Sequence, residues 1–291
     1  MNIGQESAAG GDRDPSIKSR SPGPPAARLG IAIRRGVLTI WENLGLLVAA
    51  SVTWAFLVSL PLSIERWLPN TTPAAVRLAV LALAPILAAL PTAGVFSLAH
   101  RIAIQAEVSY AHLWRDGAAL FGVALRLILI QTAAALVGGV ALSFYLRVPG
   151  WAGRGGIMIS GYGLLLWAMM LVHQWPALII QESGGLDEPG RPARRGAAAA
   201  VRRSFFLALG APFYSLALLG ALLCVLLLAC LTIVLPALIG MGAVAAATTF
   251  ATRALLVQFR ALPAPVQRAV IPDEQFRIQD AAAVPPRTDG R

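Results

Sequence analysis

The chain has 291 residues, of which 57% are hydrophobic and only 13% are charged. A soluble domain carries about 25% charged residues, so this composition excludes an ordinary soluble fold and favours a protein of the lipid bilayer. A formal net charge of +10 is also common among nucleic-acid-binding proteins. Here, long charge-free runs separate the cationic residues, as is typical of membrane proteins with basic cytoplasmic loops. We therefore expect a bilayer partner and no nucleic-acid partner.

The N-terminal region precedes the first long apolar run. Residues 1–26 are rich in Gly, Pro, Ser and charge and contain no apolar signal-peptide core, so we expect a disordered cytoplasmic tail. Residues 27–41 repeat apolar side chains at helical spacing, and their arginines lie mostly off that stripe. This pattern predicts an amphipathic helix on the inner leaflet, with a plain cytoplasmic extension of the first span as the alternative. The predicted membrane-interface residues are Arg28, Arg34, Arg35 and Trp41.

Charged residues mark the limits of the first four predicted spans. About 20 mainly apolar residues cross a bilayer as a helix. Two runs of 22 uncharged residues have this length, and two longer stretches follow them, the first broken only by Arg126. The four predicted spans lie within residues 43–64, 78–99, 117–146 and 155–181. For the third span, a shorter crossing that begins at Leu127 is the alternative.

A charge-free run of 49 residues, 204–252, is too long for one helix and suits two spans joined by a tight turn. Pro236, Gly240 and Gly242 are the predicted turn residues. We therefore predict an all-α fold: a polytopic membrane helical bundle of six transmembrane helices over residues 27–260, preceded by the interfacial helix. A second disordered cytoplasmic tail is expected over residues 261–291.

The distribution of cations predicts the orientation of the bundle. Nineteen Lys and Arg residues belong to the two terminal segments and to the loops after the second and fourth spans, against four in the opposite loops. Cationic residues favour the cytoplasmic side, so both termini should be cytoplasmic in the cell (inner) membrane. Tryptophans favour the membrane–water interface, and four of them lie near predicted span ends: Trp41, Trp67, Trp114 and Trp151.

Four polar side chains inside the predicted spans are the candidates for a substrate path. Arg126 and Gln131 belong to the third span, and His173 and Gln174 to the fourth. Polar residues within a membrane often mark substrate paths, so these two spans are expected to share a polar site or gate in the cytoplasmic half. Two alternatives stay open. Arg126 can extend its side chain to the headgroups, and His173 with Gln174 can compensate backbone groups freed by Pro176.

The sequence gives no sign of enzyme chemistry. All carboxylates lie in predicted loops, tails or span ends, so an acidic proton relay is not expected. Neither paired aspartates nor a metal-binding His cluster is present in the spans, and Cys224 and Cys230 lie in an apolar run without further metal ligands. We predict a non-enzymatic protein without metal or organic cofactor. A membrane enzyme using loop residues such as Glu65, Glu107 or Glu182 is a minor alternative.

One short motif raises a transport alternative. Asp116, Gly117 and Ala118 resemble the Asp-Gly-Ala of the coupling loop in permease subunits of ATP-driven importers. The residues expected before and after that triplet are missing here, because neither a preceding Glu-Ala-Ala nor a closing Pro is present. A permease subunit or a self-sufficient small-solute transporter is therefore the alternative reading.

Three other segments carry a broader resemblance. They are Trp41-Glu42-Asn43-Leu44, then Leu90-Pro91-Thr92-Ala93-Gly94-Val95-Phe96, and then Pro176 to Glu182 followed by a basic stretch and two closing spans. Together they resemble the YesL-like family of bacterial integral membrane proteins over about residues 34–260. Members of that family have no settled activity, and their genes often neighbour those for uptake and breakdown of plant-type polysaccharides. The resemblance implies a protein accessory to carbohydrate or solute uptake, with subunits of an ABC-type importer as partners.

Overall fold

Helices joined by short connections make up the part of the chain that the computed structural model describes, residues 41–184, 186, 195–232 and 240–259. In chain order they are α2 (Leu44–Trp67), α3 (Ala74–Ala103), α4 (Tyr110–Tyr145), α5 (Gly150–Glu182), α6 (Ala197–Gly210), α7 (Pro212–Thr232) and α8 (Met241–Gln258). No strand occurs in these ranges, which confirms the all-α prediction for them. The predicted tails and Arg28, Arg34 and Arg35 of the predicted interfacial helix lie outside the described residues.

Within these ranges, four helices are long and apolar enough to cross a membrane. They are α2, α3, α4 and α5, with 24, 30, 36 and 33 residues, and they correspond to the first four predicted spans. In the most apolar stretch of each helix only 11–33% of the residues are buried inside the protein. Exposed apolar surface on this scale suits contact with lipid, so the long helices indicate a membrane protein.

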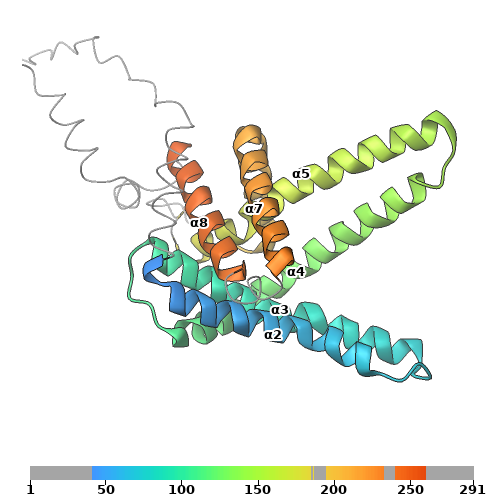
Figure 1. The fold of residues 1–291 in the computed structure, drawn as a ribbon. Helices are drawn as coiled ribbons and strands as arrows, with labels where there is room; N and C mark the ends of the chain where they lie inside the picture. The colour runs from blue at the N-terminus through green and yellow to red at the C-terminus, as the bar shows by residue number, and fades with distance from the viewer. Residues whose placement is uncertain (1–40, 185, 187–194, 233–239, 260–291) are drawn as a thin grey trace, which may run out of the picture.

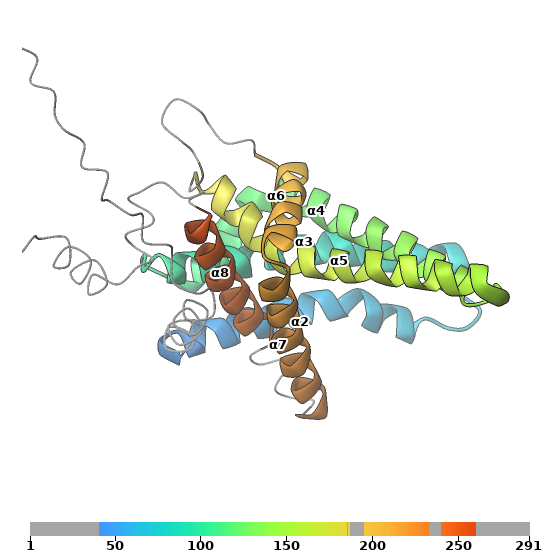
Figure 2. The ribbon, with the colours of Figure 1, turned by 90° about the horizontal axis from the view of Figure 1, so that it is seen from above.

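These four helices form two hairpins that extend from a common base (Figures 1 and 2). The turns after α2 and after α4 lie at the far ends of the two arms, and the connection after α3 and the end of α5 lie at the base. Pro73 and Pro149 stand directly before α3 and α5, where a residue without an N–H does not interrupt the helix. The first four spans therefore alternate in direction as predicted.

The start of α4 differs from the prediction. The helix begins at Tyr110, ahead of both expected starting points, Gly117 and Leu127. Ser109 precedes it, and its backbone N–H donates to Nδ1 of His112 at 3.0 Å as part of a capping box. The cap lets the helix begin in the polar stretch before the apolar run. As a result, Arg126 lies in the middle of a continuous helix.

The packed core lies at the base. It combines the second half of α3 with the first half of α4, the end of α5 and the starts of α2, α6 and α8. Gly94 of α3 and Gly117 of α4 lie at the closest approach, since a Cβ on Gly117 would lie 2.7 Å from the carbonyl oxygen of Leu90 and 3.4 Å from Cα of Gly94. Small residues allow membrane helices to approach this closely. The packing explains Gly117 of the Asp-Gly-Ala motif without a coupling-loop role.

The fifth predicted span, which starts at Ser204, is not one straight helix. Instead, α6 and α7 meet at Ala211 with a bend of 104°. Ala211 has a non-helical backbone, with φ −141° and ψ 66°, and Pro212 follows it. Proline disfavours helical geometry in the residue before it and removes a backbone donor, which explains the break. Counting the bent pair as one span, the described residues hold up to five spans; six are not established.

The predicted turn before the last helix is only partly described. Pro236 lies outside the described residues, Gly240 comes just before α8, and Gly242 belongs to the first turn of α8. Placing Gly242 in the turn was therefore wrong. Its N–H donates to Oγ of Ser51 on α2 at 2.8 Å, and a Cβ there would crowd the carbonyl oxygen of Leu47. A close contact with α2 accounts for this glycine.

Candidate functional site

Two of the four polar residues expected in the spans contact each other. Gln131 on α4 donates from Nε2 to Oε1 of Gln174 on α5 at 2.8 Å. Gln174 is fully buried, and its own Nε2 has no hydrogen-bond partner. The pair forms a polar bridge between the two helices that the sequence placed side by side.

His173 makes its contacts with other helices than this pair does. Its Nδ1 lies 2.9 Å from Oγ1 of Thr252 on α8, and its Nε2 lies 3.0 Å from Oγ of Ser215 on α7. All three side chains are fully buried. Nearby, the hydroxyl of Tyr214 donates to the carbonyl oxygen of Ala251 at 3.1 Å. His173 therefore joins α5 to both closing helices, through side-chain hydroxyls rather than through carbonyls freed by Pro176.

Arg126 is separate from these three residues. Its side chain is exposed on the surface of α4, and none of the hydrogen bonds or ion pairs found in the described ranges involves it. Residues five positions apart on a helix differ by about 140° in direction, so Arg126 and Gln131 belong to different faces. The expected polar site shared by Arg126 and His173 is not formed.

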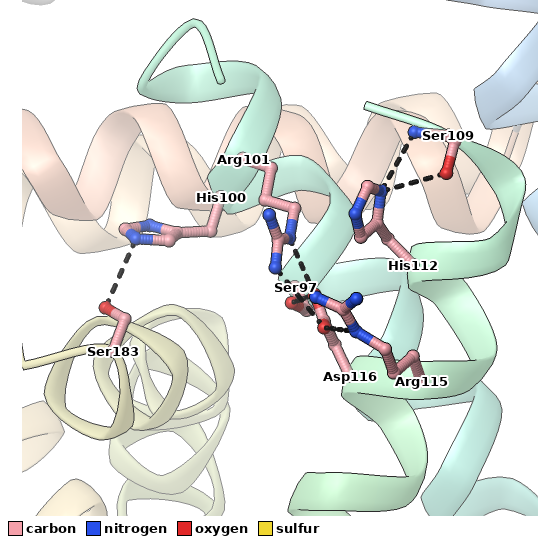
Figure 3. Close-up of polar contacts among 8 residues, drawn as sticks. All are labelled: Ser97, His100, Arg101, Ser109, His112, Arg115, Asp116 and Ser183. Atoms are coloured by element: carbon pink, nitrogen blue, oxygen red, sulfur yellow. Dashed lines mark hydrogen bonds and ion pairs between the residues drawn. The ribbon is translucent and has the colours of Figure 1, made fainter. Parts of the chain in front are cut away.

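A second polar cluster, which we call the base cluster, joins the end of α3 to the start of α4 (Figure 3). Arg101 donates from Nε and Nη2 to the two carboxylate oxygens of Asp116, at 2.6 and 3.3 Å. Ser97 also donates to Asp116, at 2.9 Å. Arg115 lies 3.8 Å from the same carboxylate, but its side chain is 75% exposed. From the sequence, Arg101 and Arg115 were predicted only to mark the cytoplasmic side. The opposite charges of Arg101 and Asp116 on either side of one short loop were the available sign of their ion pair.

The same end of the molecule links α3 to α5 and α5 to α6. Nε2 of His100 lies 3.3 Å from Oγ of Ser183, the residue after α5 (Figure 3). Gln181 is fully buried, donates to the carbonyl oxygen of Gly196 at 2.8 Å and accepts from Nη1 of Arg203 at 2.9 Å. Glu182 accepts from the N–H of Gly196 at 2.8 Å. These bonds fasten the start of α6 to the end of α5.

Arg253 is the most buried cation in the described residues. It lies on α8, only 2% of its surface is exposed, and its Nη2 atom has no hydrogen-bond partner. His100 lies close enough to interact with it electrostatically. From its place at the end of the long apolar run, Arg253 was predicted only to be a cation of the cytoplasmic side. The threonines in the preceding turns of α8 were the only sign of a polar helix face.

An apolar groove runs between α4 and α5 in their arm. It has a volume of about 450 Å³, opens to the outside, and is lined mainly by small and apolar side chains, among them Ala134, Gly138 and Leu164. Trp167 also lines it, with an indole N–H that has no partner. The four predicted path residues do not line this groove.

The predicted interfacial tryptophans lie toward helix ends. Trp41, Trp67 and Trp151 are 75%, 87% and 86% exposed, and Trp114 is 39% exposed. Trp41 lies just before α2 and Trp67 ends it, so at 1.5 Å per residue they are about 39 Å apart. That distance approaches the about 40–45 Å thickness of a bilayer with its headgroups.

The acidic residues of the described ranges are spread over the molecule. Glu65 lies 3.7 Å from Arg77 at the arm end, Glu107 is exposed in the connection before α4, and Glu182 binds Gly196. In these ranges, no group of three or more His, Cys, Asp or Glu side chains is placed to hold a metal ion. Cys224 is free and exposed, and the side chain of Cys230 is outside the described part.

Comparisons with protein-family models, with curated proteins and with solved structures found no match to this chain.

Proposed function

We propose that the protein is a multi-pass protein of the cell inner membrane with both termini in the cytoplasm. The alternating loops support this arrangement, because the arm-end turns lie on the side with few cations. The exposed tryptophans and apolar arm surfaces support the membrane location. A reporter that is active only in the periplasm, fused after Arg260, should give no signal; a strong signal would contradict the proposed orientation.

Within the membrane, we infer that the protein is a non-enzymatic accessory or assembly partner of a solute-uptake system. One observation carries this inference: buried polar side chains of the spans bind one another. Gln131 binds Gln174, and His173 bridges Thr252 and Ser215. A solute path needs polar groups that face a cavity and remain available to the solute. Because these side chains are hydrogen-bonded to one another, they support a role in helix assembly rather than in transport.

The Asp-Gly-Ala triplet supports the accessory role over a permease subunit. Gly117 is buried against α3, and the side chain of Asp116 is only 14% exposed. A coupling loop has to reach an ATP-binding subunit, so its residues need an accessible surface. Carbohydrate as the solute class is supported only by the resemblance to the YesL-like family.

Two measurements on the purified, tagged protein test the accessory role. Gentle isolation in nanodiscs followed by mass spectrometry should recover subunits of an ABC-type importer in stoichiometric amount. Proteoliposomes holding the protein alone should take up no solute that the parent cells import. Uptake by the protein alone, lost in a Gln131→Ala and Gln174→Ala double variant and kept in Arg126→Leu, would instead establish a self-sufficient transporter.

A further inference from the structure

Arg253 poses a charge problem inside the base. Arginine remains protonated in proteins, and a buried charge without a partner is strongly destabilising. Arg253 is nearly inaccessible, and its Nη2 lacks a partner. None of the ion pairs found among the described residues joins Arg253 to a carboxylate: Asp116 pairs with Arg101 and Arg115, and Glu65 pairs with Arg77.

Two further unpartnered polar atoms accompany it. Nδ1 of His100 has no hydrogen-bond partner, and His100 is only 7% exposed. Oγ1 of Thr249 also has no partner; Thr249 is 1% exposed and precedes Arg253 by one helical turn, on the same face of α8. That face continues from Ala245 and Ala246, which pack in the same core as the second half of α3. The polar face of α8 is therefore turned toward α3.

The surroundings carry positive charge. Both Arg101 and Arg253 are close enough to His100 to act on it electrostatically, and Asp116 is already bound by Arg101 and Ser97. The base end also holds Trp114, in the second turn of α4, whose side chain is partly exposed as expected for an interfacial tryptophan. At the membrane–water interface, phosphate is the most abundant anionic group.

We propose that Arg253, His100 and Thr249 form a binding site for a phosphate group between α8 and the end of α3. A guanidinium matches the geometry of phosphate oxygens, and the threonine hydroxyl supplies a second donor. His100 adds a polar ring nitrogen at the rim of the site. The phosphate comes either from an anionic lipid headgroup or from free phosphate. This site goes beyond the uptake proposal and does not depend on it.

The test uses the full-length protein in phosphatidylcholine nanodiscs, with thermal unfolding followed by tryptophan fluorescence. One arm adds phosphatidylglycerol to the nanodisc, and the other adds inorganic phosphate to the buffer. We expect the wild-type Tm to rise by a few degrees in at least one arm, because a ligand that binds only the folded state stabilises it. A rise with phosphatidylglycerol alone identifies a headgroup site, and a rise with inorganic phosphate identifies free phosphate.

Four variants make the test specific. Arg253→Gln should abolish the rise in Tm, and Arg253→Lys should keep part of it. Arg202→Gln is the matched control, because Arg202 is exposed on α6 over the ring of Phe206. It removes an equal charge and should respond like the wild type. If Arg253→Gln does not fold, Thr249→Val keeps the charge and should weaken phosphate binding several-fold.

Two results would overturn the site. The first is a wild-type protein that responds to neither probe. The second is an unchanged response in Arg253→Gln, and in Thr249→Val where the first variant does not fold.

Discussion

His173 shows how one buried side chain can hold three helices together. Its ring nitrogens lie within hydrogen-bond distance of Thr252 on α8 and Ser215 on α7, while the ring itself belongs to α5. A neutral imidazole has one donor and one acceptor, so two hydroxyls satisfy it completely. The side chain thus has a structural role that its polarity alone did not reveal.

Replacing His173 with Ala should therefore destabilise the protein. The change leaves a cavity and removes the shared partner of two buried hydroxyls, so we expect a loss of about 1–3 kcal/mol in the free energy of unfolding. SDS-induced unfolding in mild detergent, followed by tryptophan fluorescence, measures it. Arg126→Leu is the control; it should change stability by less than about 0.5 kcal/mol, because its side chain is exposed. Equal stability of both variants would contradict the role of His173 in joining α5, α7 and α8.

The ion pair of the base cluster makes a separate prediction. Asp116→Asn removes the charge that binds Arg101 and Ser97, and hydrogen bonds to charged groups are worth about 1.5–3 kcal/mol. We expect a loss of this size in the same unfolding assay. Arg115→Gln should cost less than about 1 kcal/mol, because its contact is long and its side chain is 75% exposed. A double variant of Arg101→Gln and Asp116→Asn should lose less than the sum of the two single changes.

At the scale of elements, charge-free runs predicted α2, α3, α4 and α5 well because lipid imposes a minimum length on each span. The closing helices were predicted less well. In residues 204–252 there is no charge to mark a boundary, so the 104° bend at Ala211 depended on Pro212 and on packing with α5 and α8. The start of α4 was missed for a related reason: a capping box at Ser109 lies in polar sequence, where hydropathy gives no signal.

The close contact between α3 and α4 predicts that a larger side chain at Gly117 destabilises the protein. Gly117→Val places side-chain atoms against the carbonyl oxygen of Leu90, where even a Cβ would lie at 2.7 Å. Overpacking of this kind costs about 1–3 kcal/mol, and we expect a lower Tm by size-exclusion chromatography of heated samples. Gly122→Ala, on the same helix, meets nothing within 4 Å and should leave Tm unchanged or slightly higher. A Gly117→Val protein as stable as Gly122→Ala would show that the helices need no close contact.

The candidate sites were harder to predict than the helices. Gln131 and Gln174 were expected on adjacent spans, and they do bind each other. The contacts of His173 depend on how α7 and α8 pack against α5. The long uncharged run does not predict that packing. Arg253 was hidden by its position at the end of that run, because a count of cations per loop carries no information on burial.

At the scale of the whole molecule, a hydrogen-bonded base carries two apolar arms (Figure 1). Buried polar contacts are concentrated at the base, where α3, α4, α5, α6 and α8 meet. The arms expose large apolar side chains and an open apolar groove. Lipid is as apolar as these side chains, so the arms gain little by packing on each other, and polar bonds and small residues hold the helices together.

This division predicts which loops reach each side of the membrane. After replacement of Cys224 and Cys230 by Ser, single cysteines at Asn70 and Arg147 report on the two arm ends, and a cysteine at Glu107 reports on the base; all three positions are exposed. A membrane-impermeant maleimide should label the first two in intact cells and the third only after permeabilisation. The reverse pattern would mean an inverted orientation. Labelling of Asn70 and Arg147 from different sides would contradict the common placement of the arm ends, because a single bilayer cannot then hold both hairpins as spanning pairs.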